Sequence, residues 1–165
     1  MKKDKKIINK LVNLYNLELD AHNHYMCYAS ILDKIGVDNI AKFVKKLASD
    51  KTEAHITRIY DYLVFFREPL EINLSNVKKN ILETVNKEKS IRKNVFLILS
   101  EVLKNELKNR EHVNELADFA LNSKDYETFE FIQWFIKDYV KDIRELERLI
   151  ELIDDQEISV HEAKI

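Results

Sequence analysis

The sequence predicts an all-α protein folded as a four-helix bundle, and three observations support that fold class. The chain of 165 residues contains one glycine and one proline, so tight turns and strand boundaries have almost no material. Apolar residues recur at three- and four-residue intervals through four long segments. A long polar stretch separates the second segment from the third. We therefore expect a single domain over residues 1–165, with the bundle at about 5–154 and a short tail at 155–165.

The first two helices follow from this spacing. The first is expected over residues 5–34, because its apolar side chains share one face and Gly36 follows as a C-terminal cap. The second is expected over about 37–66, with Pro69 just beyond its end. Because the turn between the two helices is short, they must run antiparallel.

The second half begins with a crossover. Within residues 67–93, REPLEINLSN is typical of an extended linker, and VKKNILETVNKEKSI is compatible with a short extra amphipathic helix. The third helix is expected to end near Leu121, and Asp125 is a suitable N-cap for a fourth helix over about 126–154. The result is an up-down bundle with one long crossover between helices two and three.

Charge and composition exclude several classes of function. The net charge is −2 with 34% charged residues of both signs, so no basic stripe indicates a nucleic-acid partner. No apolar run is long enough to span a membrane or to serve as a signal-peptide core. The single Cys27 excludes an internal disulfide framework and a cysteine-based zinc cluster. We expect a soluble cytoplasmic protein.

Several polar residues fall on faces that should point inward. Glu18, His22 and Tyr25 share one face of the first helix, since four and seven residues separate them. A buried carboxylate is costly unless it is paired or binds a metal. Two interpretations stay open: a metal site, or a solvent-facing Glu18 that His22 caps or pairs with.

The later helices carry further acidic residues. Taken alone, Glu106 is typical of a surface glutamate paired with Arg110 one turn on. Asp138 and Asp142 are one turn apart, a spacing usual for a solvated helix face.

Three segments of the sequence change the interpretation of these residues. They are NLEL with Tyr25 seven residues after Glu18, HITRIYDYL at 55–63, and DYETFEFIQWF at 125–135. Together they resemble the corresponding stretches of bacterial non-haem ferritins. The likeness covers residues 7–153, with the helices in the same order and the crossover in the same place.

The resemblance implies an iron-storage or detoxification protein that oxidises Fe(II) with O2 or H2O2 at a ferroxidase centre holding two irons per subunit. It also implies a homo-oligomer, at least a dimer. The metal ligands carried over by position are Glu18, His55, Glu106 and Asp142. Tyr25 would be the catalytic phenol beside them, Asp138 would belong to an outer third site, and His22 is a further candidate ligand. Oxygen ligands suit Fe(III), and an imidazole helps to hold Fe(II).

The sequence departs from the family pattern at three positions. The family places a bridging glutamate three residues before the histidine of the second helix, where this chain has Thr52. Tyr139 stands where the family usually has a glutamine, and the outer site has Lys141 in place of a ligand. The ligand set is therefore incomplete.

Two explanations stay open. Compared with the family it resembles, the second helix carries one more residue between Phe43 and His55. A π-bulge would absorb this residue while turning the carboxylate of Asp50 or Glu53 toward Glu18 and Glu106. Alternatively, the site has lost ferroxidase activity, and the bundle serves a structural or partner-binding role.

In a site without metal, converging carboxylates must hold protons or bind a cation such as Lys51 or Lys141. The tail QEISVHEAKI is too short for the fifth helix that bacterial ferritins pack around a four-fold axis. We therefore expect dimers, or an assembly smaller or looser than 24 subunits.

Overall fold

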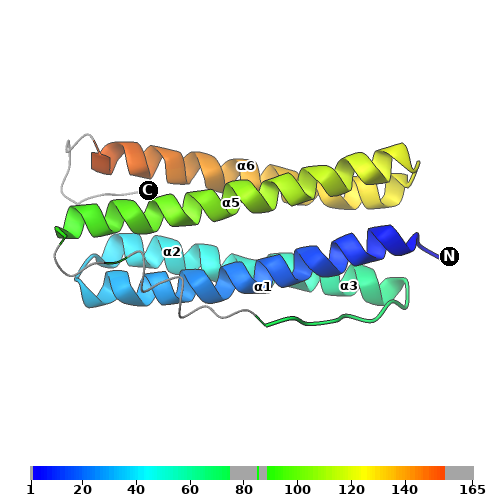
Figure 1. The fold of residues 1–165 in the computed structure, drawn as a ribbon, viewed down its shortest axis with the longest axis horizontal. Coiled ribbons are helices and arrows are strands. Elements are labelled where there is room, and N and C mark those ends of the chain that lie inside the picture. The colour runs from blue at the N-terminus through cyan, green and yellow to red at the C-terminus, as the bar shows by residue number, and fades with distance from the viewer. Residues whose placement is uncertain (1, 75–84, 86–88, 155–165) are drawn as a thin grey trace.

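The computed structural model describes residues 2–74, 85 and 89–154, and this part of the chain is helical with no strand (Figure 1). The helices are α1 (Lys5–Lys34), α2 (Asp38–Asp50), the π-helix η1 (Lys51–Ile56), α3 (Thr57–Phe65), α5 (Ile91–Asn122) and α6 (Tyr126–Asp154). Because α2, η1 and α3 follow one another without a break, they form one long helix. The bundle therefore consists of four rods, namely α1, the second rod formed by α2, η1 and α3, and then α5 and α6. The expected all-α four-helix bundle is confirmed.

The helix ends are fixed by local signals, and two of them, Gly36 and Asp125, were expected from the sequence. Asp4 caps α1 by accepting a hydrogen bond from the backbone N–H of Lys6. Gly36 ends that helix in the left-handed region, at φ +78°, where a side chain would be strained. Asp125 caps α6, since the backbone N–H of Thr128 donates to its Oδ1 at 3.1 Å. The expected limits of the first and fourth helices agree with those observed.

The beginning of the crossover lies against α1. The side chain of Asn16 donates to the carbonyl of Glu71 at 2.8 Å and accepts from the backbone N–H of Asn73 at 2.7 Å. Two hydrogen bonds from one amide therefore hold this extended segment along the first helix. Most of the expected short helix at 77–91, and the tail at 155–165, lie outside the described residues.

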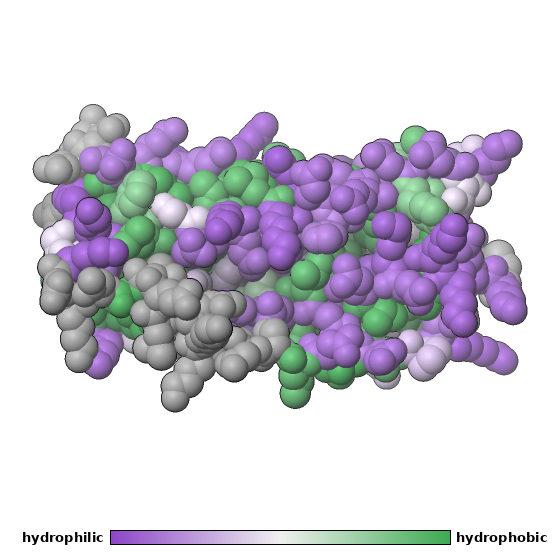
Figure 2. Space-filling model, viewed as in Figure 1, coloured by the Kyte–Doolittle hydropathy of each residue, from purple (hydrophilic) through white to green (hydrophobic). Residues whose placement is uncertain are grey.

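The apolar core consists of two clusters, one toward each end of the bundle. The first holds residues 21–32 of α1, 37–48 of α2, 95–102 of α5 and 146–153 of α6. The second holds residues 7–14 of α1, 59–63 of α3, 113–117 of α5 and 132–143 of α6. The outer surface is mostly hydrophilic on the face that Figure 2 shows. Each rod also carries buried polar residues that lie between the two clusters or at the edge of one of them. The middle of the bundle therefore contains polar side chains.

None of the described helices combines the length and the apolar character that crossing a membrane would require.

Candidate functional site

The polar centre depends on the π-helix in the second rod. A π-turn holds one residue more than an α-turn and rotates everything after it by about 100°. The wide turn expected between Phe43 and His55 is present at Lys51–Ile56. It turns the side chains of Lys51 and His55 inward, and both are 0% exposed. Glu53 is exposed, so the expectation that its carboxylate points at Glu18 and Glu106 is wrong.

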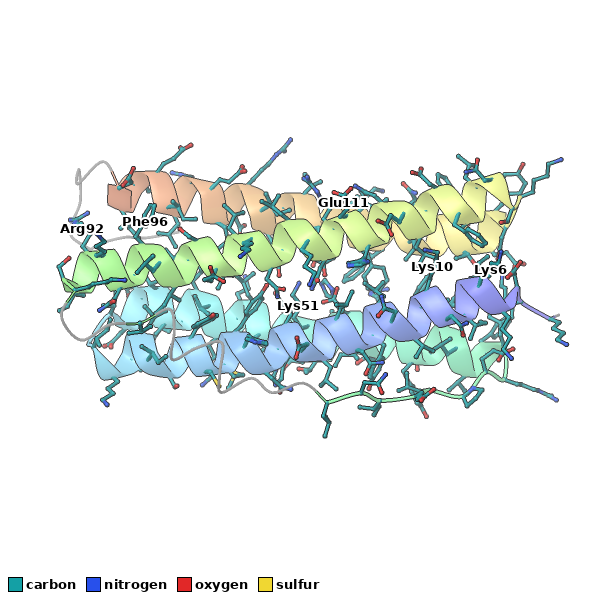
Figure 3. The ribbon with its side chains drawn as sticks, in the orientation of Figure 1. Lys6, Lys10, Lys51, Arg92, Phe96 and Glu111 are labelled. Atoms are coloured by element: carbon teal, nitrogen blue, oxygen red, sulfur yellow. The ribbon has the colours of Figure 1, made fainter. Side chains whose placement is uncertain are left out.

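The ammonium group of Lys51 lies between two buried carboxylates, near the middle of the bundle's length (Figure 3). Its Nζ is 2.8 Å from Oε1 and 3.1 Å from Oε2 of Glu106, and 3.5 Å from Oε2 of Glu18. It also lies 4.4 Å from the ring centroid of Tyr139, a cation–π contact. Burial would lower the pKa of Lys51, but Glu106 and Glu18 raise it above its ordinary value. Of the alternatives considered for carboxylates without a metal, namely protons or a cation such as Lys51 or Lys141, the structure has Lys51 at Glu18 and Glu106.

Glu18, from the middle of α1, is the second carboxylate at this cation. It accepts a hydrogen bond from the hydroxyl of Tyr139. Its Oε2 lies 3.1 Å from Nδ1 of His55, an ion-pair distance without the alignment of a hydrogen bond. Burial would raise the pKa of Glu18, but the charges on Lys51 and His55 lower it to about 2. Glu18 is therefore a buried carboxylate, and the solvent-facing alternative is wrong.

His55 is a buried cation held between two acidic groups. Its Nε2 donates to Oδ2 of Asp138 at 2.7 Å, and its ring edge packs against Trp134 and Tyr139. Burial would lower the pKa of His55, but Glu18 and then Asp138 raise it to about 9. An imidazolium carries a proton on both ring nitrogens and has no lone pair for a metal. As the site stands at neutral pH, His55 is an ion-pair partner.

Tyr25 holds the other carboxylate in place. Its hydroxyl donates to Oε1 of Glu106 at 2.6 Å and accepts from the side chain of Asn105 at 3.1 Å. Burial and the adjacent Glu106 raise the pKa of Tyr25 well above its ordinary value. The phenol stays protonated and orients Glu106 toward Lys51.

Asp142 lies at the edge of the cluster and is only 2% exposed. Its Oδ1 is 3.6 Å from Nζ of Lys141, and its Oδ2 has no hydrogen-bond partner in the described part of the chain. Burial, with the negative charges of Asp138 and Glu106, raises the pKa of Asp142 to about 7. The solvated face expected for Asp142 is wrong, as is the surface position considered for Glu106, which is 0% exposed.

Two other candidate residues are not brought into this cluster. His22 contacts the carbonyl of Ala48 through Nδ1 at 2.7 Å, which joins α1 to α2, so the pairing considered with Glu18 is wrong. Asp50 is half-buried at the end of α2, and no contact of its carboxylate with Glu18 or Glu106 occurs among the described residues.

Among the buried polar residues that sequence reasoning did not single out, Asn109 is the one that follows Glu106 on α5. Asn109 lies three residues after Glu106 on α5 and is 1% exposed. Within the described ranges, neither its amide oxygen nor its amide nitrogen has a hydrogen-bond partner. The three-residue spacing from Glu106 is the signal that would have found it.

The positions of these side chains decide whether the cluster can bind a metal. Unbonded oxygens of Glu18 and Asp142 are the kinds of atom that iron accepts as ligands, whereas Nδ1 of His55 would first have to lose its proton. However, the Lys51 ammonium takes the space between Glu18 and Glu106, where a metal would need to bind both. A cation a few ångströms from a divalent ion in a dry core is strongly repelled. The residues as arranged do not fit a di-iron centre, and no metal-binding group of three or more His, Cys, Asp or Glu occurs in the described ranges.

The whole bundle is similar to known ferritins. The family described as Ferritin-like domain matches residues 8–155. The crystal structure of M. penetrans ferritin superimposes with a TM-score of 0.80 at 31% identity, covering 96% of this chain and 91% of that one.

Curated relatives support the same family. The Uncharacterized protein UU427 of Ureaplasma parvum serovar 3 is 31% identical over 156 residues, covering 94% of this chain and 86% of that protein. The Bacterial non-heme ferritin of Escherichia coli O6:H1 is 29% identical over 151 residues, covering 91% of this chain and 82% of that protein. With most of the chain matched, the same helix order and the same bundle, this protein belongs to the ferritin-like family.

Proposed function

We propose that this chain is a ferritin-like structural subunit of a cytoplasmic homo-oligomer, without ferroxidase activity at a di-iron site inside the subunit. The observation that supports this function is the position of the Lys51 ammonium, 2.8 Å from Glu106 and 3.5 Å from Glu18. This choice favours the second of the two explanations that the sequence left open.

The carboxylates of the site have cationic partners without a metal. The positive groups of Lys51 and His55 face the carboxylates of Glu18, Glu106 and Asp138. Iron binding between Glu18 and Glu106 requires the Lys51 ammonium to leave both carboxylates. Separating a buried ion pair costs several kcal/mol, so two irons at this position are disfavoured.

A second candidate function, Fe(II) oxidation for iron storage or detoxification, is favoured by one observation. Three potential ligand atoms, on Glu18, His55 and Asp142, are buried without hydrogen-bond partners in the described part of the chain. This candidate requires the Lys51 side chain to swing out, the imidazolium of His55 to lose a proton, and iron to take their place.

Stopped-flow oxidation separates the two candidates. Fe(II), at two equivalents per chain, is mixed with aerobic wild type, Glu18→Ala and Glu53→Ala, and Fe(III) absorbance is followed. We expect all three proteins to match the rate in buffer alone. Rapid oxidation by wild type and Glu53→Ala, abolished in Glu18→Ala, would establish the ferroxidase candidate and defeat our proposal. Glu53 is a suitable control because it lies in the same π-helix but is exposed.

The assembly is tested separately. We expect light scattering of the full chain to show dimers, or a particle smaller or looser than 24 subunits. A stable hollow particle of 24 subunits would contradict this expected size, and a monomer at micromolar concentration would contradict the homo-oligomer itself.

A further inference from the structure

A pocket of about 600 Å³ lies between α1 and α5, which run side by side in opposite directions (Figure 1). One wall is formed within residues 20–28 of α1 and the other within residues 97–108 of α5. The volume falls in the range of about 300–1,000 Å³ that is typical of pockets for small organic molecules. Neither Glu18 nor Lys51 is among the described residues that line it, so the pocket lies beside the polar centre and not within it.

Cationic side chains outnumber acidic ones around this pocket. Lys89, Lys104 and Lys108 line it, against Asp20 and Glu101. The three ammonium groups have no ion-pair or hydrogen-bond partner in the described part of the chain. Lys104 and Lys108 are one turn apart on α5, and like charges at this spacing repel each other. An anion between them would remove that repulsion.

His24 and Asn105 place hydrogen-bonding groups near these lysines. The side chain of Asn105 donates to the hydroxyl of Tyr25 at 3.1 Å, so their neighbours His24 and Lys104 lie at about the same level of the bundle. Nδ1 of His24 donates to the carbonyl of Asp20 at 2.8 Å, because a carbonyl oxygen can only accept. The Nε2 atom of His24 has no partner within the described ranges. This nitrogen is therefore free to share a proton with an anionic ligand.

The other end of the pocket is less polar. Because α1 and α5 are antiparallel, Tyr28 and Leu97 line the same end, away from Lys108. Glu101 lies between Leu97 and Lys104 along α5, and a carboxylate accepts hydrogen bonds from hydroxyl groups. The pocket thus offers cations to an anionic group, and an apolar surface with a hydrogen-bond acceptor to an organic group.

We propose that this pocket binds a phosphate monoester of a sugar or of a nucleoside. Lys104, Lys108 and His24 hold the phosphate, whose charge of about −2 at neutral pH matches the two ammonium groups. The organic part lies toward Tyr28 and Leu97, and Glu101 accepts from its hydroxyl groups. A site for a small molecule goes beyond the structural role proposed above and does not depend on it.

Isothermal titration calorimetry of the full chain at pH 7 tests this site, with AMP, ribose 5-phosphate, adenosine and inorganic phosphate as the four probes. Sodium chloride at about 0.1 M screens charges more than about 10 Å apart, which suppresses non-specific attraction. The decisive variant combines Lys104→Gln with Lys108→Gln. The matched control combines Lys42→Gln with Lys46→Gln, since these lysines are also exposed and four residues apart on one helix, and neither lines the pocket.

We expect wild type to bind AMP or ribose 5-phosphate at one per chain, at least ~10-fold more tightly than adenosine or inorganic phosphate. The Lys104 and Lys108 double variant should lose at least ~10-fold in affinity for the ester, and the control variant less than ~2-fold. Glu101→Ala should weaken binding of the ester without weakening that of inorganic phosphate. Equal affinities for AMP and ribose 5-phosphate would identify a sugar phosphate as the ligand, and tighter binding of AMP would identify a nucleotide.

Three results would overturn the proposal. The first is the absence of saturable binding of either ester by wild type. The second is an equal loss of affinity in the two double variants, which would show that any exposed lysine pair attracts the phosphate. The third is an affinity for inorganic phosphate equal to that for the esters, because the apolar end of the pocket and Glu101 would then contribute nothing.

Discussion

Among the lysines that pair with two carboxylates each, Lys3 lies at the end of the bundle and Lys51 at its centre. Lys3 lies 2.7 Å from Asp125 and 2.9 Å from Glu127, and Glu127 is 55% exposed. Lys51 has similar distances, but it and both of its carboxylates are 0% exposed. The side chains of Lys3 and Asp125 are 6% and 15% exposed, so at Lys3 water can replace mainly Glu127, whereas at Lys51 it can replace neither carboxylate. The same ion-pair chemistry therefore contributes less at the end of the bundle than at its centre.

The largest effect is expected for Lys51→Met. The substitution leaves Glu18 and Glu106 buried without their shared cation, and loss of one partner of a buried pair costs about 3–5 kcal/mol. Urea unfolding at pH 7 measures the free energy of unfolding. A loss no larger than that of the matched variant Lys3→Met would remove the distinction between the two lysines.

The next effect concerns pH and tests the cationic state of His55. Its pKa is about 9 in the folded protein against 6.5 for the free side chain, so its contribution to stability is complete below pH 6.5 and is lost as the pH rises through 9. Between pH 7 and 9 the free energy of unfolding of wild type should fall by about 2 kcal/mol. His55→Gln should show a much flatter profile over the same range. Parallel profiles would mean that His55 is neutral in the folded protein.

Tyr25→Phe should have a slightly smaller effect. It removes the 2.6 Å hydrogen bond to Glu106 without changing the shape of the core, and a hydrogen bond to a charged group contributes about 2 kcal/mol. Chemical unfolding gives the value, and Tyr15→Phe, at a partly buried tyrosine outside the polar centre, is the control. Equal losses in the two variants would show that Tyr25 does not support Glu106 electrostatically.

The smallest effect is expected for Lys3→Met. Of the two ion pairs of Lys3, the one with Glu127 is open to water, and such pairs contribute about 1 kcal/mol or less and are screened by salt. The loss of stability should shrink further in 1 M NaCl, whereas that of Lys51→Met should change little. A salt-independent loss for Lys3→Met would show that this end of the bundle excludes water as well as the centre does.

Helix positions were predictable because their signals are local. Asp125 caps α6 and Gly36 ends α1 through hydrogen bonds and backbone geometry that depend on neighbouring residues. The π-helix was also predictable, since one extra residue between Phe43 and His55 must be absorbed somewhere in the turn.

The inward residue of that π-helix was harder to predict. A π-turn shifts the helix face by about 100°, and a shift of one residue decides whether Lys51 or Glu53 enters the core. Burial of Glu106 and Asp142 was likewise missed by reading single helices, because their burial depends on the charges that other helices bring. Lys51 was recognised only as an available cation, since a lysine is seldom buried unless it is paired.

The most direct test of the metal-free centre is diffraction at the iron absorption edge from wild-type crystals soaked aerobically with Fe(II). Our account predicts no anomalous peak among Glu18, His55 and Glu106, and electron density for the Lys51 ammonium in contact with both glutamates. Two iron peaks at this position, with the Lys51 side chain displaced from the core, would contradict it.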